Sequence, residues 1–171
     1  KKLTISSYLV ITIAVIILVN NFIVSNIFKN KSNEIKNREY LLSLKDFNDD
    51  VYTEDDILVD ENNSFLAHKL FYSAYGKNKK LSYELFESDH KWMVNWNFNR
   101  MMDWFENQGI SYTEIETNLP NKVKVYTNEK KNNYIMLSSN KVIEVMGIDE
   151  IDNKEDVLNV VYNKIFTVNE E

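Results

Sequence analysis

The residues of this chain that could do chemistry are acidic, aromatic and histidine side chains, because the chain has no cysteine and thiol chemistry is excluded. His68 and His90 lie in no motif with the spacing of metal ligands, such as H-E-x-x-H. His90, beside Asp89 and Trp92, could be a base in a pocket, although an ordinary polar residue in the first turn of a helix is the more frequent case.

A phosphate-binding glycine loop is not expected either. The chain has three glycines, Gly76, Gly109 and Gly147, and each falls at an expected turn or at the end of an expected element. The sequence therefore predicts a protein that is not an enzyme, with no catalytic residues and no cofactor.

An acidic run lies between residues 46 and 61, which contain eight acidic residues and no basic one. Asp46, Asp49 and Asp50 could supply oxygen ligands to calcium, but the run lacks the D-x-D-x-D-G order that wraps one ion. A solvated or partner-facing loop is the preferred interpretation, with apolar contacts from 51–52 and 57–59, and no metal site is predicted.

An aromatic strip is expected on a helix that follows Ser88 and runs to Gln108. Trp96 and Trp104 are two helical turns apart with Arg100 between them, so the three side chains share one side of the helix. Such a strip is either the edge of the core or a binding surface, since Trp and Arg dominate interface energetics. The predicted partner-binding residues are thus Asp49, Asp50, Tyr52, Asp55, Asp56, Trp96, Arg100 and Trp104.

The charge of the chain indicates what kind of partner it binds. Residues 40–171 contain 14 Lys and Arg against 24 Asp and Glu, a net charge of −10. Nucleic acid requires a basic surface, so it is an unsuitable partner. A protein with a basic surface is favoured, because complementary charge speeds encounter and selects partners.

The amino-terminal residues 3–28 carry no charge and are long enough to cross a bilayer as a helix. We expect an uncleaved, single-pass transmembrane anchor over 1–28, in contact with the membrane through 3–28, and a polar tether over 29–39. Two lysines precede the span, and three lysines and one arginine follow it, so the positive-inside rule does not favour the usual orientation with the amino terminus inside. The short basic start favours a signal anchor in the cell membrane, with the carboxyl-terminal domain extracytoplasmic.

Residues 40–171 are expected to form one acidic α+β domain. Residues 65–75 are interpreted as a helix followed by a strand at 81–86, and the alternative is a strand pair in which 71–75 and 81–86 flank a turn at 76–80. The helix that follows Ser88 and runs to Gln108 has Val94, Phe98, Met101, Met102 and Phe105 at the helical period, and Gly109 supplies its stop.

Four short segments then predict an antiparallel meander: 110–116, 122–127, 133–138 and 141–146. A last helix begins at Asn153 and packs back on the sheet through Val157, Val160, Val161 and Ile165. The predicted fold class is α+β, with an amino-terminal transmembrane helix followed by an antiparallel sheet of four or five strands packed by two or three helices.

The layout of anchor and small α+β domain, with the aromatic segment 92–99 followed by 109–112, resembles TipC-type immunity proteins of Gram-positive bacteria. The resemblance implies a stoichiometric inhibitor that protects the producing cell from antibacterial LXG toxins exported by type VII secretion, by binding without turnover. Two other functions stay open: a structural subunit of an envelope, conjugation or secretion apparatus, and an enzyme.

Overall fold

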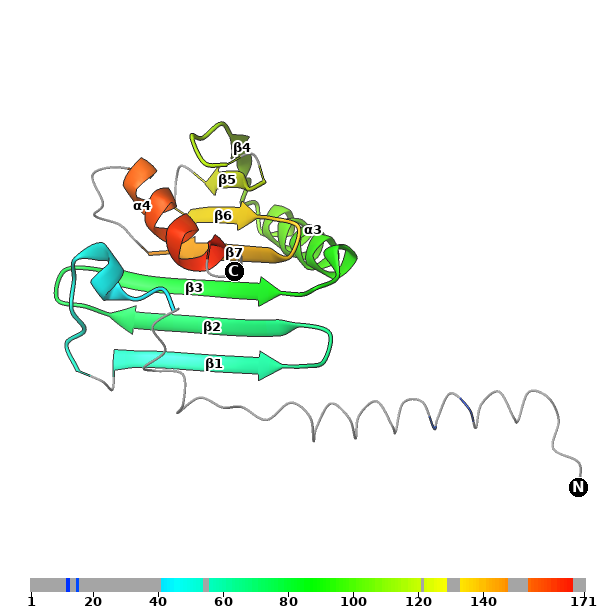
Figure 1. Cartoon of the computed structure of the whole chain (residues 1–171), viewed down its shortest axis with the longest axis horizontal. Coiled ribbons are helices and arrows are strands. Elements are labelled where there is room, and N and C mark those ends of the chain that lie inside the picture. The colour runs from blue at the N-terminus through cyan, green and yellow to red at the C-terminus, as the bar shows by residue number, and fades with distance from the viewer. Residues whose placement is uncertain are drawn as a thin grey trace, which may run out of the picture.

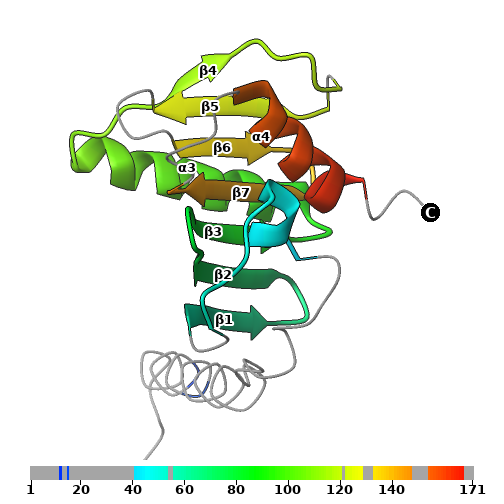
Figure 2. The ribbon, with the colours of Figure 1, turned by 90° about the vertical axis from the view of Figure 1, so that its left-hand side faces the viewer.

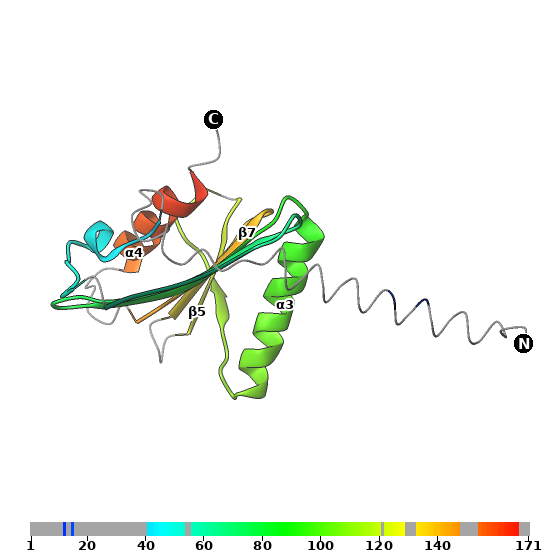
Figure 3. The same cartoon turned by 90° about the horizontal axis from the view of Figure 1, so that it is seen from below.

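The computed structural model describes residues 41–53, 56–120, 122–128, 133–147 and 154–167, together with Thr12 and Val15. These residues form one antiparallel sheet of seven strands with a helical layer on each face (Figures 1 and 3). The strands are β1 (Ile57–Asn63), β2 (His68–Tyr75), β3 (Lys80–Glu87), β4 (Thr113–Ile115), β5 (Lys124–Asn128), β6 (Asn133–Leu137) and β7 (Lys141–Met146). The helical elements are a 3-10 turn η1 (Leu44–Phe47), the helices α3 (Lys91–Asn107) and α4 (Lys154–Val161), and a π-helical turn η3 (Tyr162–Phe166).

The sheet consists of two meanders that meet in the middle. Its strand order is β1-β2-β3-β7-β6-β5-β4, so β1 to β3 pair in chain order and β4 to β7 do the same. α3 follows β3 and carries the chain to β4 at the far edge (Figure 2). The antiparallel pair of β3 and β7, with Leu85 opposite Ile143, then joins the two meanders.

The larger core lies on the sheet face that α4 and η1 cover. Alternate residues of each strand point to this face, as Leu70, Tyr72 and Ala74 do on β2, where all three are buried. α4 contributes one apolar stripe, because residues four apart lie on the same side of a helix. That stripe is formed by Val157, Leu158 and Val161, all buried.

The opposite face packs against α3, which confirms the helix predicted between Ser88 and Gly109. Val94 and Phe105 are buried against Phe86, Ile135 and Val142 of the sheet. The helix ends at Asn107, two residues before Gly109, whose φ of 71° is in the left-handed region that side chains disfavour.

The strands and the last helix of the carboxyl-terminal half agree with those predicted from the sequence. β4, β5, β6 and β7 occupy the four segments predicted as strands and pair antiparallel in chain order. α4 begins at Lys154, one residue after the predicted start, and it buries Val157 and Val161 as expected. The antiparallel meander and the last helix were therefore predicted correctly.

The amino-terminal half of the domain differs from the prediction. Residues 65–75 are not a helix: β2 runs over most of them and pairs with β3 as the alternative interpretation proposed. The acidic segment 57–63 is not a loop but the edge strand β1, paired with β2 from Ile57 opposite Ala74 to Asn63 opposite His68. With β1 and β2, which the favoured interpretation lacked, the sheet has seven strands instead of the expected four or five.

The predicted anchor (1–28), its membrane contact through 3–28 and the tether (29–39) lie outside the described residues, apart from Thr12 and Val15. In the part of the chain that the structure describes, no helix is long and apolar enough to cross a membrane. The fold class predicted from the sequence, a transmembrane helix followed by a sheet of four or five strands, is therefore wrong as stated. Among the described residues the structure shows a seven-stranded antiparallel sheet, with α3 and α4 as the helices of two turns or more.

Candidate functional site

The outer side of α3 presents three tryptophans to solvent. Trp92, Trp96 and Trp104 are 65%, 54% and 56% exposed, while Val94 and Phe105 on the inner side are buried. The guanidinium of Arg100 lies over the ring of Trp96, 5.2 Å from its centroid. The predicted strip therefore exists as a surface, and its aromatic rings are exposed rather than part of the core. We call Trp96, Arg100 and Trp104 the tryptophan strip.

A groove of about 470 Å³ lies between α3 and the sheet, next to this strip. Arg100, Met101 and Trp104 form part of its helical wall. Its other wall is the α3-facing side of the sheet, where Glu84 of β3 lies directly opposite Glu144 of β7. Aromatic, thioether and carboxylate groups therefore line one concave surface, as is typical of binding sites.

The deepest charge that lines the groove is Glu144, which is 7% exposed. The hydroxyl of Tyr112 donates a hydrogen bond to Glu144 Oε1 at 2.9 Å, and the amide of Asn133 donates to the Tyr112 hydroxyl at 3.4 Å. Burial raises the pKa of Tyr112 far above its ordinary value, and the negative charge of Glu144 raises the pKa further. Tyr112 therefore acts as a hydrogen-bond donor that orients the Glu144 carboxylate.

The basic side chains of the groove lie nearer the solvent. Lys69 Nζ is 2.7 Å from Glu84 Oε1, and both side chains are at least one-third exposed. Arg100 is exposed and its guanidinium is directed over Trp96, which does not line the groove. The described basic side chains that line the groove are thus near its rim, whereas the Glu144 side chain is buried.

The predicted acidic binding residues have mixed environments. Asp49 is 6% exposed, and its Oδ2 accepts hydrogen bonds from the backbone N–H groups of Asn78 and Lys79 at 3.1 and 2.9 Å. Burial opposes ionisation of Asp49, but these N–H donors outweigh it and hold its pKa below the ordinary value. Asp49 therefore fixes the turn between β2 and β3 and is not a surface ligand for a partner.

The other residues predicted to bind a partner in the acidic run differ in their surroundings. Asp56 accepts hydrogen bonds from the backbone N–H and the hydroxyl of Thr53 at 2.8 and 2.9 Å. Asp50 is exposed, and Tyr52 is 62% exposed with its hydroxyl donating to the carbonyl of Lys77 at 3.0 Å. Asp55 lies outside the described residues.

The two parts of the predicted binding site do not come together. Residues 49–53 lie beside the turn between β2 and β3, whereas α3 starts beyond the other end of β3 (Figures 1 and 3). A partner that contacts the tryptophan strip therefore approaches a different end of the molecule from one that contacts Asp50 and Tyr52.

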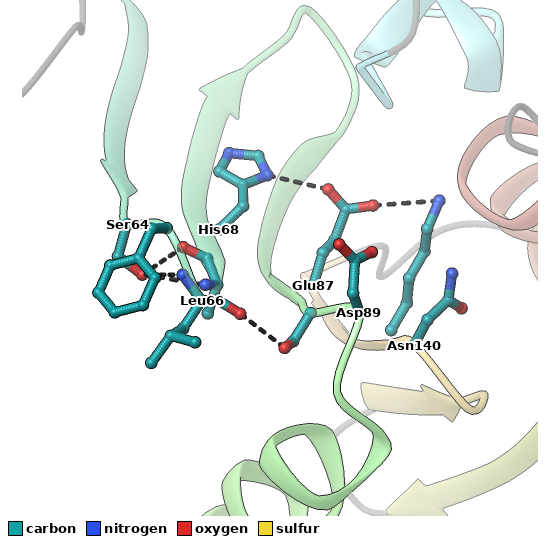
Figure 4. Close-up of a pocket in the computed structure, with 10 residues that line it drawn as sticks. Ser64, Leu66, His68, Glu87, Asp89 and Asn140 are labelled. Carbon is teal, nitrogen blue, oxygen red and sulfur yellow. Dashed lines mark hydrogen bonds and ion pairs between the residues drawn. The ribbon is translucent and has the colours of Figure 1, made fainter.

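A second pocket, of about 230 Å³, contains an ion network that sequence reasoning missed (Figure 4). His68 lies between two carboxylates, with Nε2 2.7 Å from Glu61 Oε1 and Nδ1 2.9 Å from Glu87 Oε2. Lys141 Nζ lies 3.1 Å from Glu87 Oε1 and donates to the carbonyl of Ile165 at 2.6 Å. We call Glu61, His68, Glu87 and Lys141 the charge network.

The charge network favours the charged form of His68. The hydrogen bond to Glu87 raises the pKa of His68, burial opposes it, and the charges of Glu87 and Glu61 add to the rise. Burial would raise the pKa of Glu87, but His68 and Lys141 together keep it below its ordinary value. An imidazolium donates from both nitrogens, so this ring suits an ion pair between strands better than the role of a base.

The hydroxyls near this pocket are also bonded to the backbone. Ser88 Oγ donates to the carbonyl of Leu66 at 2.7 Å, and Ser64 Oγ donates to the carbonyl of Ala67 at 2.9 Å (Figure 4). His90, the other histidine, is exposed at the start of α3, with its ring 6.4 Å from that of Trp92. Alternation along 57–63 places Glu61 inward with Val59, and this was the signal that could have indicated a buried acid.

Among the described residues, no group of three or more His, Asp or Glu is arranged to hold a metal ion. Asp46 and Asp49, considered above as calcium ligands, bond to different groups: Asp46 accepts from Ser43, and Asp49 accepts from the turn after β2. Comparison of the chain with protein-family models, with characterised proteins and with solved structures finds no match.

Proposed function

We propose that this protein is a non-catalytic binding module that recognises another protein through the tryptophan strip and the groove beside it. The observation that carries this proposal is the exposure of Trp92, Trp96 and Trp104, each more than half accessible on one helix. Large aromatic rings are rarely left in water together unless a partner covers them, and Trp and Arg contribute most to interface energy.

The charge of the chain supports a basic partner. Residues 40–171 carry a net charge of −10, which attracts a positively charged surface over a distance and speeds its encounter. Two carboxylates, those of Glu84 and Glu144, also line the groove. A partner with basic side chains among apolar ones would match both the strip and the groove.

Within this class, we propose that the protein is an immunity protein that neutralises a secreted antibacterial toxin of the LXG type by stoichiometric binding. What supports the narrower proposal is the aromatic segment 92–99, on which the resemblance to TipC-type proteins rests and which contains two of the three exposed tryptophans. Binding without turnover needs a complementary surface and no catalytic residues.

The test is capture of the partner from the cells that make this chain. The double variant Trp96→Ala/Trp104→Ala should lose the partner by roughly tenfold or more, since buried interface tryptophans are typical hot spots. The matched control is Tyr52→Ala, which removes an equally exposed aromatic ring at the other end of the molecule. It should bind like the wild type, and both variants should keep the wild-type unfolding midpoint.

Other results of the capture experiment would point to a different interface or a different function. Loss of binding in Tyr52→Ala with retention in the double variant would place the interface on the acidic run and contradict the proposal. Capture of one toxin in equal molar amount supports the immunity function. Capture of several membrane subunits would instead indicate a structural part of an envelope apparatus.

A further inference from the structure

We propose that the edge strand β1 binds an extended, basic segment of another protein, which adds to the sheet as a further strand. This goes beyond the function proposed above, because it names a second contact surface with its own mode of recognition. β1 lies at one edge of the sheet (Figure 2), and β2 separates it from β3, the nearest of the strands that pack against α3.

The two edges of the sheet differ in length. β4 has three residues, whereas β1 has seven, and within the described residues β1 pairs with β2 on one side and with no strand on the other. Each residue of β1 is matched by one residue of β2, from Ile57 opposite Ala74 to Asn63 opposite His68, so the strand contains no bulge. A long, regular edge presents backbone N–H and C=O groups at the spacing that another strand needs.

β1 lacks the features that usually keep an edge strand from pairing. Its seven residues include no proline and no lysine. A charge that points into the core can also discourage pairing, but Glu61 is compensated by His68, whose Nε2 is 2.7 Å from Glu61 Oε1. Leu58 is 60% exposed beside this edge. A strand added to β1 would cover part of the Leu58 side chain, since cross-strand neighbours are in contact.

The charge of β1 determines which strand can pair with it. Asp60 is exposed in the middle of β1, and it lies on the same face as Leu58, because alternate residues of a strand point to the same side. No lysine or arginine occurs between residues 46 and 61. A basic side chain opposite Asp60 would form a favourable cross-strand pair, whereas an acidic one would be repelled.

A second copy of this chain fits the edge less well than a basic segment does. Two β1 strands that pair antiparallel about their central residue would place one Asp60 opposite the other, and like charges in that position repel. Residues 40–171 carry a net charge of −10, so two copies also repel over a longer distance. Charge complementarity therefore favours a basic segment from a different protein.

The test uses the full chain and a labelled heptapeptide of alternating lysine and valine, acetylated and amidated at its ends, with binding followed by fluorescence anisotropy. Its lysines would lie on the face of Leu58 and Asp60, and its valines would extend the core beside Val59. The matched probe has glutamate in place of every lysine. We expect the lysine peptide to bind at least about tenfold more tightly than the glutamate peptide, and more weakly at high salt.

Two further versions of the lysine peptide separate strand pairing from simple attraction of opposite charges. They carry N-methyl groups on alternate amides, one version for each edge of the peptide, so the side chains and the charge are unchanged. At least one version should lose affinity by about tenfold or more, because a methylated edge cannot donate hydrogen bonds to β1. In backbone NMR spectra, the lysine peptide should shift the amide signals of β1 and leave those of β4 in place.

The variant Asp60→Lys should weaken binding of the lysine peptide by about tenfold and keep the wild-type unfolding midpoint, because Asp60 is exposed. Its control is Glu116→Lys, the same charge reversal at an exposed residue just after β4, and this variant should bind nearly like the wild type. If Asp60→Lys does not fold, Asp60→Asn should weaken binding in the same direction by a smaller factor.

Several results would overturn the proposal: equal binding of the glutamate peptide, wild-type affinity for both methylated peptides, wild-type affinity in the Asp60 variants, or amide shifts confined to β4. Dimerisation of the wild-type chain with protection of the β1 amides from hydrogen exchange would also overturn it, since a second copy would then occupy the edge.

The Trp96→Ala/Trp104→Ala variant keeps this test separate from that of the proposed function, and it should bind the lysine peptide like the wild type. Failure of peptide binding, with partner capture still dependent on the tryptophan strip, would refute only the proposal for β1. Capture of the partner by the double variant, with peptide binding intact, would refute only the proposed function.

Discussion

At the scale of single residues, the side chains with the most unusual environments belong to the charge network. Glu61 is 2% exposed and Lys141 is 4% exposed, so this network places ionised groups inside the fold. Such groups are tolerated where each is paired and hydrogen-bonded, as His68 is on both ring nitrogens. The protonation of one ring therefore affects the pairing of β1, β2 and β3.

The charge network predicts how stability depends on pH. The folded pKa of His68 is above 6.5, so its contribution is fully present below about pH 6.5 and is lost as pH rises through the folded value. The pKa of Glu87 is below 4.5, so its contribution is present above that value and is lost on further acidification. We expect the free energy of unfolding to be largest between these two values, as measured by urea unfolding across pH.

The two histidines of the chain give a matched pair of variants for this prediction. His68→Gln should abolish the loss of stability above pH 6.5, and it should lower the stability at pH 6. His90→Gln removes the exposed histidine and should keep the wild-type pH profile. An unchanged profile in His68→Gln would show that the charge network does not control stability.

The predicted acidic binding residues show that composition alone does not tell which carboxylates reach solvent. Asp49 and Asp50 are adjacent and chemically equal, yet one is buried against the turn after β2 and the other faces solvent. Gly76 is the reason, because it lets Asp49 approach: a Cβ there would collide with Asp49 Oδ2 and lie 2.9 Å from Leu44 Cδ1. The sequence predicts an acidic segment, but which carboxylates are free to bind depends on a turn nearly thirty residues away.

At the scale of elements, α3 has two functions, one on each side. Its inner side joins the core and its outer side bears the tryptophan strip, and both follow from the helical period read in the sequence. The depth of each inner residue does not follow from the period. Phe98, expected as a core residue, is partly buried against the ring of Tyr126 at 5.0 Å, whereas Phe105 is 6% exposed.

The difference in burial between Phe98 and Phe105 predicts unequal losses of stability when each is replaced by alanine. Phe105→Ala should destabilise the protein by about 3–5 kcal/mol, because it leaves a cavity in a closed core. Phe98→Ala should cost about 1–2 kcal/mol, since solvent already reaches part of that ring. Chemical unfolding of both variants measures the difference. Equal costs, or a larger cost for Phe98→Ala, would show that the packing of α3 is not as described.

The error at residues 65–75 has a physical cause. Leu66, Leu70 and Ala74 are four residues apart, and a spacing of four fits both the helical period of 3.6 and the strand period of 2. Tyr72, between Leu70 and Ala74, is buried on the same side, which only a strand permits. In 57–63 the charged Glu61 points inward, so the alternation of apolar and polar residues that marks a strand is interrupted. Its ion-pair partner His68 lies in the next strand, and the segment alone therefore does not show why a charge is buried there.

At the scale of the whole molecule, both cores share one sheet. The core under α4 and the core under α3 pack on opposite faces of the same strands, so neither can be lost without exposing the sheet (Figure 3). A shared sheet favours unfolding as one unit.

We therefore expect residues 40–171, made without 1–39, to fold as a monomer and to unfold in a single transition. Fluorescence and circular dichroism should give coincident curves, and the calorimetric and van't Hoff enthalpies should agree. Two separated transitions, or loss of cooperativity, would refute the assignment of 40–171 to one domain.

The pairing of β3 with β7 also determines the order in which this sheet can form. Each meander is made of hairpins between neighbours in sequence, which close fast, whereas β3 and β7 are separated by α3 and three strands. The entropy of closing that long loop makes the β3–β7 pair a late event. Until this pair forms, β3 and β7 are both open edges whose backbone groups can pair with another chain. We therefore expect the nascent protein to be most prone to aggregation at these two strands.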